Sequence, residues 1–266
     1  MSKFPQRNRI IASEFDEGWM LEINGEVQSH VDLQEPRVIR FEYLRRIANV
    51  LDLCWPPTEP ISILHLGAGA LTLGRYAQVT RPGSHQTVIE LDPELDPELI
   101  PLVTTRLPLP EGTDLAVITG DARTALQELD EQRFDAIIVD IFTGHDTATH
   151  LTEDSFYRGL MQHLSARGVL LVNIGDDEGL AFFGQQAQTL HTVAVDAGLP
   201  GAWTLADAST LNGRLAGNAV LAAGPGLSTA HDDMTALRSR LEAAGPHPGS
   251  VLIPTETARF SENIVG

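Results

Sequence analysis

Short apolar runs alternate with helical patterns along most of this chain of 266 residues. Two runs, AIIVD ending at Asp140 and VLLVN ending at Asn173, are apolar at consecutive positions, which is typical of parallel strands covered by helices on both faces. The alternation predicts an α/β fold with a doubly wound, mostly parallel seven-stranded sheet. The predicted strands are Ile61 to Leu66, Thr87 to Leu91, Leu115 to Thr119, Ala136 to Asp140, Val169 to Asn173, Trp203 to Ala206 and Asn218 to Ala223.

Helical periodicity separates most of these strands. The last two strands have a polar, glycine-containing stretch between them and no helical pattern, which predicts an antiparallel pair at the edge of the sheet. The predicted helices of this region are Leu71 to Gln78, Ala122 to Leu129, Phe156 to Leu164, Gly179 to Ala197 and Asp232 to Ala244.

The first part of the chain follows different patterns. Residues 10 to 33 alternate in part, and Asn24-Gly25 is a strong type I′ hairpin signal. From Pro36 the apolar residues follow a helical period until Trp55-Pro56-Pro57 ends it. We therefore predict a β-hairpin region over 1–35, a linking helix over 36–57 and an α/β domain over 58–266.

Charge and cysteine content exclude several function classes. The formal net charge of −18 repels phosphate backbones and anionic lipid, so nucleic-acid and membrane-surface binding are not expected. Lys3 is the only lysine, which excludes a lysine nucleophile from the rest of the chain. Cys54 is the only cysteine, so no intrachain disulfide can form. The start of the sequence does not have the pattern of a signal peptide, and the nine histidines show no metal-ligand spacing, so we expect a cytoplasmic protein without a metal site.

The turn after the first predicted α/β strand contains Gly67 and Gly69, at a position where backbone N–H groups and a helix N-terminus can meet a nucleotide. The full GxGxxG pattern is not present, and a tight structural turn explains the two glycines equally well. Glu90 lies 23 residues after Gly67, near the spacing at which a carboxylate binds ribose hydroxyls.

Two further strands also end in polar residues. Gly120-Asp121-Ala122 follows the third strand, where Asp121 either caps the next helix or reaches an adenine amino group. Asp140 ends the fourth strand. Because the carboxyl ends of parallel strands line one crevice, these signals together predict an adenosine site. The glycine turn has no lysine or arginine for phosphates, which favours an S-adenosyl nucleotide over ATP or NAD.

In order along residues 20 to 225, the segments GEVQS, HLGAGALTLGR, VIELDP, ITGDAR, FDAIIVDIF and LTEDSFYRGLMQHLSARGVLLVNI resemble the spermidine synthase (polyamine aminopropyltransferase) family. The resemblance implies the methyltransferase-like Rossmann fold of class I. It further implies that Glu90 and Asp121, with Ala122 beside them, hold ribose and adenine, that Gln28 lies over the nucleotide, and that Asp140 is the general base. The family also implies a homodimer, for which the apolar residues Trp19, Met20 and Leu21 offer a surface.

The sequence departs from the family where the amine is held. Ala70 stands where the family has an aspartate in the glycine turn, and Thr143-Gly144 stand where it has a second catalytic aspartate and a proline. Arg40 and Phe41 replace a tyrosine and a histidine, and only Glu42 is retained. Asp146 either substitutes for the lost carboxylate or is a solvated loop residue, and His145 and His150 of the same loop are candidates for substrate contact.

Three functions follow from these residues. The first is transfer of an aminopropyl group from decarboxylated S-adenosylmethionine to a cationic amine such as putrescine, with Glu42 and Asp146 on the amine side. The second is a methyltransferase that uses S-adenosylmethionine, favoured by the loss of the ammonium-binding acid at Ala70. The third is a protein that binds S-adenosyl nucleotides or methylthioadenosine without catalysis, favoured by the missing second carboxylate.

Overall fold

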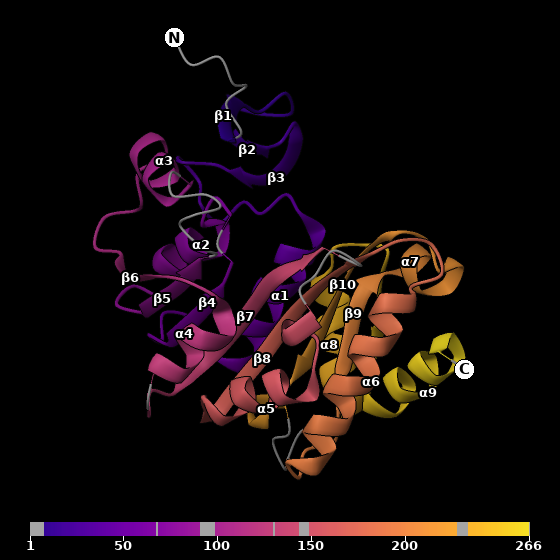
Figure 1. Cartoon of the computed structure of the whole chain (residues 1–266). Coiled ribbons are helices and arrows are strands. Elements are labelled where there is room, and N and C mark those ends of the chain that lie inside the picture. Colours follow the sequence, from indigo (N-terminus) through magenta and orange to yellow (C-terminus); the bar gives the residue numbers. More distant parts are fainter. Residues whose placement is uncertain are drawn as a thin grey trace.

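A small antiparallel sheet stands beside a large mixed sheet with helices on both faces (Figure 1). The computed structural model describes residues 8–67, 69–90, 99–129, 131–143, 149–227 and 234–265. The small sheet has the order β1-β2-β3, and the large sheet has the order β11-β9-β10-β8-β7-β4-β5-β6. The predicted α/β class with a methyltransferase-like sheet is confirmed, and the N-terminal appendage is a three-stranded sheet.

The strands β4 to β8 pair parallel with one another, whereas β10 pairs antiparallel with both β8 and β9. The predicted antiparallel pairing of β9 with β10 is therefore confirmed. The strand bounds are β1 Asn8–Ala12, β2 Trp19–Ile23, β3 Glu26–Val31, β4 Ser62–Leu66, β5 His85–Glu90, β6 Asp114–Thr119, β7 Phe134–Thr143, β8 Leu164–Asp176, β9 Trp203–Asp207, β10 Gly217–Ala223 and β11 Gly249–Leu252.

The prediction of seven strands in the large sheet is wrong by one. The additional strand, β11, pairs antiparallel with β9 beyond the predicted edge. It has only four residues, and two of them are glycine and serine, so its sequence carries no strand pattern. A short helix, α7, also lies between β9 and β10, where none was predicted; it begins after Asp207, whose side chain accepts a hydrogen bond from the amide of Ser209.

Helix α1 begins later than the sequence pattern indicates. Phe41, the residue before the helix, is in an extended conformation, and the helical period from Pro36 to Arg40 is not realised as helix. The helix bounds are α1 Glu42–Cys54, α2 Thr72–Thr80, α3 Leu99–Arg106, α4 Ala122–Glu128, α5 Asp154–Gln162, α6 Ala181–Asp196, α7 Ala208–Gly213, α8 Met234–Ala244 and α9 Pro254–Val265, with short 3₁₀ turns at Thr149–Leu151 and Pro225–Leu227.

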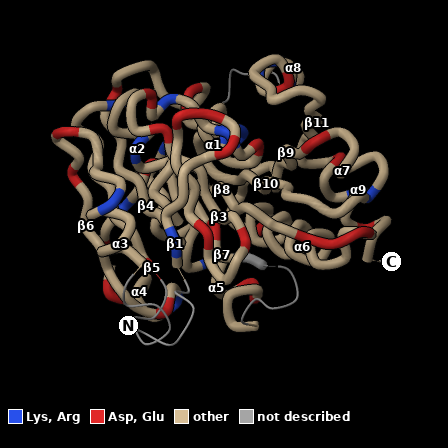
Figure 2. The backbone as a smooth tube through the Cα atoms, turned by 90° about the horizontal axis from the view of Figure 1, so that it is seen from above, with Lys and Arg blue, Asp and Glu red and all other residues tan. Residues whose placement is uncertain are grey.

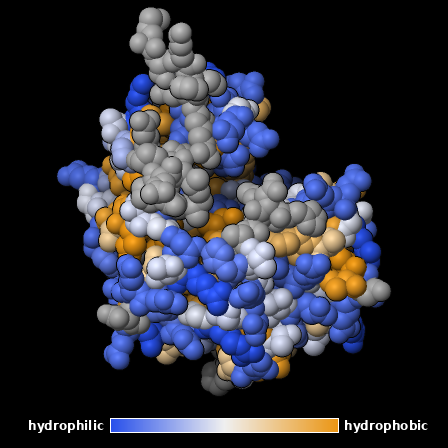
Figure 3. Space-filling view, viewed as in Figure 1, coloured by the Kyte–Doolittle hydropathy of each residue, from blue (hydrophilic) through white to orange (hydrophobic). Residues whose placement is uncertain are grey.

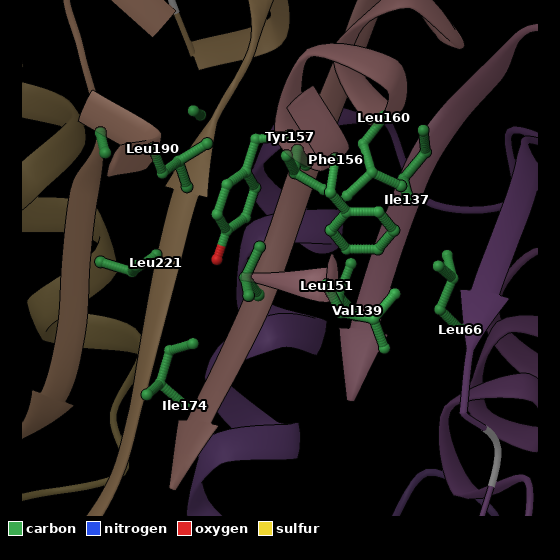
Figure 4. Close-up of a cluster of buried hydrophobic side chains, with 14 of the residues drawn as sticks. Leu66, Ile137, Val139, Leu151, Phe156, Tyr157, Leu160, Ile174, Leu190 and Leu221 are labelled. Atoms are coloured by element: carbon green, nitrogen blue, oxygen red, sulfur yellow. The ribbon is translucent and has the colours of Figure 1, made fainter. Parts of the chain in front are cut away.

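Each face of the large sheet has its own core. Helices α1, α2 and α8 cover one face, and α4, α5 and α6 cover the other, with α9 packed on α6. Figure 4 shows the second core, where Phe156 of α5 lies beside Ile137 and Val139 of β7, and Tyr157 lies on the side of Leu190 and Leu221. Burial of a large apolar side chain of this kind contributes about 1.5–3 kcal/mol to stability.

The N-terminal sheet packs on the start of α2 and on α3, and in the space-filling view it projects from the body of the molecule (Figure 3). Leu21 and Val31 of this sheet share an apolar cluster with Leu71. Met20 and Leu21 are thus buried within the chain, and only Trp19, which is 38 % exposed, remains available for a dimer surface. The expectation that all three residues offer such a surface is therefore wrong, because two of them fill the core of their own chain.

Seen from above, acidic residues spread widely around the molecule (Figure 2), in keeping with the net charge of −18.

None of the helices in the described ranges combines the length and apolar character that a membrane-crossing helix needs.

Arg75 connects α2 to its surroundings from a buried position. It is 1 % exposed, and its guanidinium donates to the carbonyl oxygens of Ala70 at 3.1 Å, Leu107 at 2.6 Å and Pro108 at 2.7 Å. Burial lowers the pKa of Arg75 to about 10, so this side chain remains a cation at neutral pH. It joins the glycine turn to the end of α3.

Replacing this cation should therefore destabilise the fold. We expect Arg75→Leu to lower the free energy of unfolding by about 3 kcal/mol, because three carbonyl oxygens, two of them in buried hydrogen bonds, lose a charged donor. Urea unfolding of both proteins measures this difference. Arg133→Leu, at an exposed position where the arginine donates to the neighbouring Gln132 carbonyl, is the control and should change stability by less than about 0.5 kcal/mol. Equal small losses in both variants would contradict the structural role of Arg75.

Candidate active site

The turn between β4 and α2 has the backbone shape that its glycines predict. Gly67 has φ +78° and Gly69 has φ +49°, both in the region that glycine adopts most readily. A Cβ atom at Gly67 would lie 2.5 Å from the carbonyl oxygen of Asp140, so no side chain fits there. Helix α2 then begins at Thr72 without a side-chain cap. The turn therefore packs directly on the end of β7.

The neighbouring strand ends are tied to this turn by backbone hydrogen bonds. The Gly67 amide donates to the carbonyl of Ile89 at 2.9 Å, and the Gly120 amide donates to the carbonyl of Glu90 at 3.1 Å. Glu90 thus lies between the glycine turn and the turn that contains Asp121. The strand order β7-β4-β5-β6 brings Asp140, Gly67, Glu90 and Asp121 to one edge of the sheet, as a shared crevice requires.

Asp140 lies between two hydrogen-bond donors. The hydroxyl of Tyr43, on α1, donates to Oδ2 of Asp140 at 3.1 Å, and Nδ2 of Asn173, on β8, donates to Oδ1 at 2.8 Å. Burial raises the pKa of the Asp140 carboxyl above its usual value, although these two hydrogen bonds oppose the rise. Burial and the adjacent Asp140 also raise the pKa of Tyr43, so its hydroxyl stays protonated.

Sequence reasoning missed Tyr43 and assigned its neighbour Glu42 to the amine side. The Glu42 side chain is 54 % exposed and pairs with Arg46, one helical turn further along α1, at 3.3 Å. No signal in the sequence distinguishes the two positions, because the choice depends on which face the first turn of α1 presents to β7. A role for Glu42 with substrate remains a prediction.

Asp121 caps helix α4, which is one of the two roles that the sequence predicts for it; the other is contact with an adenine amino group. Its Oδ1 accepts from the amide of Thr124 at 3.0 Å, and its Oδ2 accepts from Nε2 of His150 at 2.7 Å. Burial acts to raise the pKa of Asp121, but the hydrogen bonds from His150 and Thr124 outweigh it, and the pKa is lowered. An adenine amino group at this carboxylate would share Oδ2 with His150 or displace it. Ala122, next in the chain, is buried.

Gln28 and Ser29 take different positions in β3. Gln28 is exposed, whereas the buried hydroxyl of Ser29 accepts a hydrogen bond from the Ala70 amide at 3.2 Å. The Thr72 hydroxyl donates to the carbonyl of His30 at 2.9 Å. The N-terminal sheet is therefore attached to the glycine turn through Ser29 and the His30 backbone, and the role of Gln28 over a nucleotide remains a prediction.

A pocket opens where these elements meet. Its lining includes Ser29, Leu44 of α1, Gly67, Asp140 and His65. Burial lowers the pKa of His65 to about 4, so the ring is neutral, and its Nε2 lies 3.0 Å from Oε1 of Gln86. His65 is a buried residue of β4.

The positions that depart from the family have other partners in this chain. Arg40 donates to Asp16 at 2.6 Å, and Phe41 stacks on Tyr43 with ring centroids 6.2 Å apart. Ala70 is fully buried in the apolar cluster beneath the N-terminal sheet. The predictions for Asp146 and His145 lie outside the described residues. In the described ranges no three His, Cys, Asp or Glu residues group as metal ligands.

Comparisons with known proteins agree with this arrangement. No family model matches the chain. The polyamine aminopropyltransferase of Neisseria meningitidis is 26 % identical over 148 residues, covering 55 % of this chain and 54 % of that protein. The corresponding protein of Vibrio vulnificus is 31 % identical over 153 residues, covering 56 % and 49 %. The matched region thus spans about half the length of these relatives.

Solved structures extend the likeness to almost the whole chain. A probable spermidine synthase from Corynebacterium glutamicum has a TM-score of 0.79 and 26 % identity, covering 97 % of this chain and 91 % of its own. Human methyltransferase-like protein 13, solved with SAH, has a TM-score of 0.53 and 17 % identity, covering 84 % and 88 %, and shows the fold alone. In sequence and fold, this chain is similar to the spermidine synthases, or polyamine aminopropyltransferases.

Proposed function

We propose that this protein transfers an aminopropyl group from decarboxylated S-adenosylmethionine to an amine such as putrescine. Asp140 is the main support for this proposal: a partly buried carboxylate at the crevice edge, held by Tyr43 and Asn173 beside the glycine turn. A group in this position can accept a proton from an incoming ammonium. Relatedness to aminopropyltransferases supports the same reaction class.

The proton transfer has to overcome a difference in acidity. With an amine pKa near 10 and a carboxyl pKa near 4, deprotonation in water is uphill by about 6 units, on the order of 8 kcal/mol. Burial raises the pKa of Asp140 and so reduces this difference from the carboxylate side. After the proton passes to Asp140, the amine lone pair attacks the carbon next to the sulfonium. The N–C bond forms, the C–S bond breaks, and methylthioadenosine leaves as a neutral thioether.

The donor side of this proposal uses the edge of the sheet. Glu90 would bind the ribose hydroxyls, Asp121 and Ala122 would lie at the adenine, and the turn at Gly67 and Gly69 would allow the donor to approach the backbone closely. Gln28 would lie over the nucleotide from the N-terminal sheet. A homodimer and a cytoplasmic location belong to the same proposal.

A methyltransferase that uses S-adenosylmethionine is the second candidate. It is favoured by the surroundings of Ala70, which is buried among apolar side chains and whose carbonyl accepts from the buried guanidinium of Arg75. A cation behind this position disfavours an ammonium and favours a donor that also carries a carboxylate.

The donor site is tested first. We expect Glu90→Gln to weaken binding of methylthioadenosine by about 1–3 kcal/mol, because the ribose hydroxyls lose a charged acceptor. Isothermal titration calorimetry measures the affinity. Asp114→Asn, at the opposite end of the β5–β6 pair, is the matched control and should bind as wild type does. Unchanged affinity in a folded Glu90→Gln protein would place the ribose elsewhere.

The base is tested by Asp140→Asn, which removes the charge and keeps the shape. Aminopropyl transfer should fall about 100- to 10,000-fold, with methylthioadenosine binding nearly unchanged. Asp135→Asn is the control from the same strand: Asp135 accepts from the Ser62 amide and the Ser165 hydroxyl, so this variant should lose stability and keep transfer. Full transfer by Asp140→Asn would exclude Asp140 as the base.

The raised pKa of Asp140 also predicts a pH effect on stability. Because the folded protein binds the Asp140 proton more tightly than the unfolded chain does, ionisation of this carboxyl costs folding free energy at pH 7. Asp140→Asn avoids that cost and should be at least as stable as wild type at pH 7. The difference should shrink as the pH falls through the raised pKa of the folded state and disappear below 3.8, where the wild-type carboxyl is protonated in both states. Urea unfolding at several pH values measures it.

Donor choice separates the two candidates. Placing aspartate at Ala70 and Thr143 should raise aminopropyl transfer and shift preference toward the decarboxylated donor, because the ammonium gains a partner and the carboxylate of S-adenosylmethionine meets repulsion. Product formation from both donors with putrescine and spermidine measures the ratio, with asparagine at both positions as the neutral control. Methyl transfer without aminopropyl transfer by the wild-type protein would favour the second candidate.

A further inference from the structure

Asn173 carries a buried oxygen that the chain leaves without a partner. Asn173 is 4 % exposed, and among the described residues its Oδ1 accepts no hydrogen bond. Its Nδ2 donates twice, to Asp140 Oδ1 at 2.8 Å and to Asn218 Oδ1, on β10, at 3.2 Å. Both hydrogens of the amide nitrogen are thus used, while the oxygen of the same amide is unsatisfied.

The orientation of this amide is fixed by its neighbours. An ionised carboxylate only accepts hydrogen bonds, so the nitrogen and not the oxygen of Asn173 must face Asp140. Turning the amide over would place two oxygens against each other. A buried carbonyl oxygen without a donor costs free energy, and such groups in folded proteins usually meet a partner, which here is a residue outside the described ranges, a water molecule or a bound ligand.

The location of Asn173 indicates what kind of partner this is. The oxygen belongs to a side chain that touches the proposed base, on the sheet face covered by α1, from which Tyr43 also reaches Asp140. A group that donates to both Asp140 and Asn173 needs at least two hydrogens on one atom. A primary ammonium has three and a water molecule has two, whereas a tertiary ammonium and a hydroxyl have one each; of these, only the primary ammonium is also a substrate of the proposed reaction.

We infer that Asn173 is a specificity-determining residue of the acceptor site, whose Oδ1 accepts a hydrogen bond from the attacking nitrogen of a primary amine. This inference rests on the proposed function and specifies its acceptor. The bound ammonium donates to Asp140 and to Asn173, and the proton held by Asp140 is the one that leaves. The nitrogen keeps its bond to Asn173, and its freed lone pair forms the N–C bond as the C–S electrons pass to sulfur. Asn218 supports the amide from the other side without touching the amine.

Two substitutions separate the oxygen of Asn173 from its nitrogen. Asn173→Leu removes the acceptor and the donors at similar volume, and Asn173→Asp keeps an acceptor while removing the amide donors. Asn218→Ala is the matched control, because it removes one partner of Nδ2 and leaves Oδ1 in place. The full-length proteins are titrated by calorimetry with putrescine and with its tetramethylated tertiary-amine analogue, in the presence of methylthioadenosine, and transfer to putrescine is assayed in parallel.

Wild type should bind putrescine at least about tenfold more tightly than the tertiary amine. Asn173→Leu should lose about tenfold in putrescine affinity and most of this preference, with methylthioadenosine binding unchanged. Asn173→Asp should recover putrescine affinity relative to Asn173→Leu, and Asn218→Ala should stay within about twofold of wild type.

Four results would overturn the inference: wild-type protein that binds no amine, equal binding of both amines by wild type, unchanged putrescine affinity in Asn173→Leu, or equal losses in the leucine and aspartate variants. The last result would assign the effect to the support of Asp140 by Nδ2. The affinities of the wild-type protein for the two amines can be compared even if a variant fails to fold. Putrescine binding with the expected pattern but without aminopropyl transfer would support the role of Asn173 in amine recognition and contradict the proposed reaction.

Discussion

The contact between Gly67 and the backbone of Asp140 is the constraint on which the rest of the site depends. Strand β4 ends at Leu66, which pairs with Val139 of the parallel strand β7, and the chain after β4 turns so tightly that no Cβ fits between Gly67 and the backbone of Asp140. The turn that faces a nucleotide and the carboxylate that faces an amine are therefore parts of one packed unit. A side chain at Gly67 would have to separate them.

The small N-terminal sheet contributes to the same unit. Ser29 accepts from the Ala70 amide, the His30 carbonyl accepts from Thr72, and Arg75 holds the carbonyl of Ala70 from below. Polar contacts from two directions thus fix the residues between β4 and α2. The appendage is not an independent addition to the α/β domain, because part of its inner surface completes the glycine turn.

The sequence predicted the features that follow from periodicity and from strand ends. Buried parallel strands have nearly continuous apolar runs, so the ends of β4, β5 and β6 could be located, and with them Gly67, Glu90 and Asp121. The predicted end of β7 at Asp140 is wrong, because the strand continues to Thr143 past an irregularity in its pairing with β8. Tyr43 was not predictable in this way. Successive helical residues point about 100° apart, and whether Glu42 or Tyr43 faces β7 depends on how α1 is rotated in the packed structure.

The role of Asn173 could not be predicted from the sequence either. The sequence pattern places it at the end of an apolar strand, but the role of its amide depends on hydrogen bonds to Asp140 and Asn218, which lie 33 residues before it and 45 residues after it on other strands. The sequence patterns of β11 and α7 are also too short to predict a strand or a helix. A strand of four residues contains too few positions for alternation to stand out, and its pairing depends on an edge that the rest of the sheet creates.

The hydrogen bonds between α1 and the segment after α8 have a consequence for the order in which the chain folds. Asn49 donates to the carbonyl of Gly245 at 2.6 Å and Arg46 to that of Pro246 at 3.2 Å, across separations of 196 and 200 residues. Contacts between positions so far apart are late events in folding, since closing a long loop has an entropic cost that earlier local structure has to offset. Helix α1 therefore gains its final support only when the last segment of the sheet arrives. Tyr43 lies on that helix, so the position of its hydroxyl against Asp140 depends in part on contacts with residues near the other end of the chain.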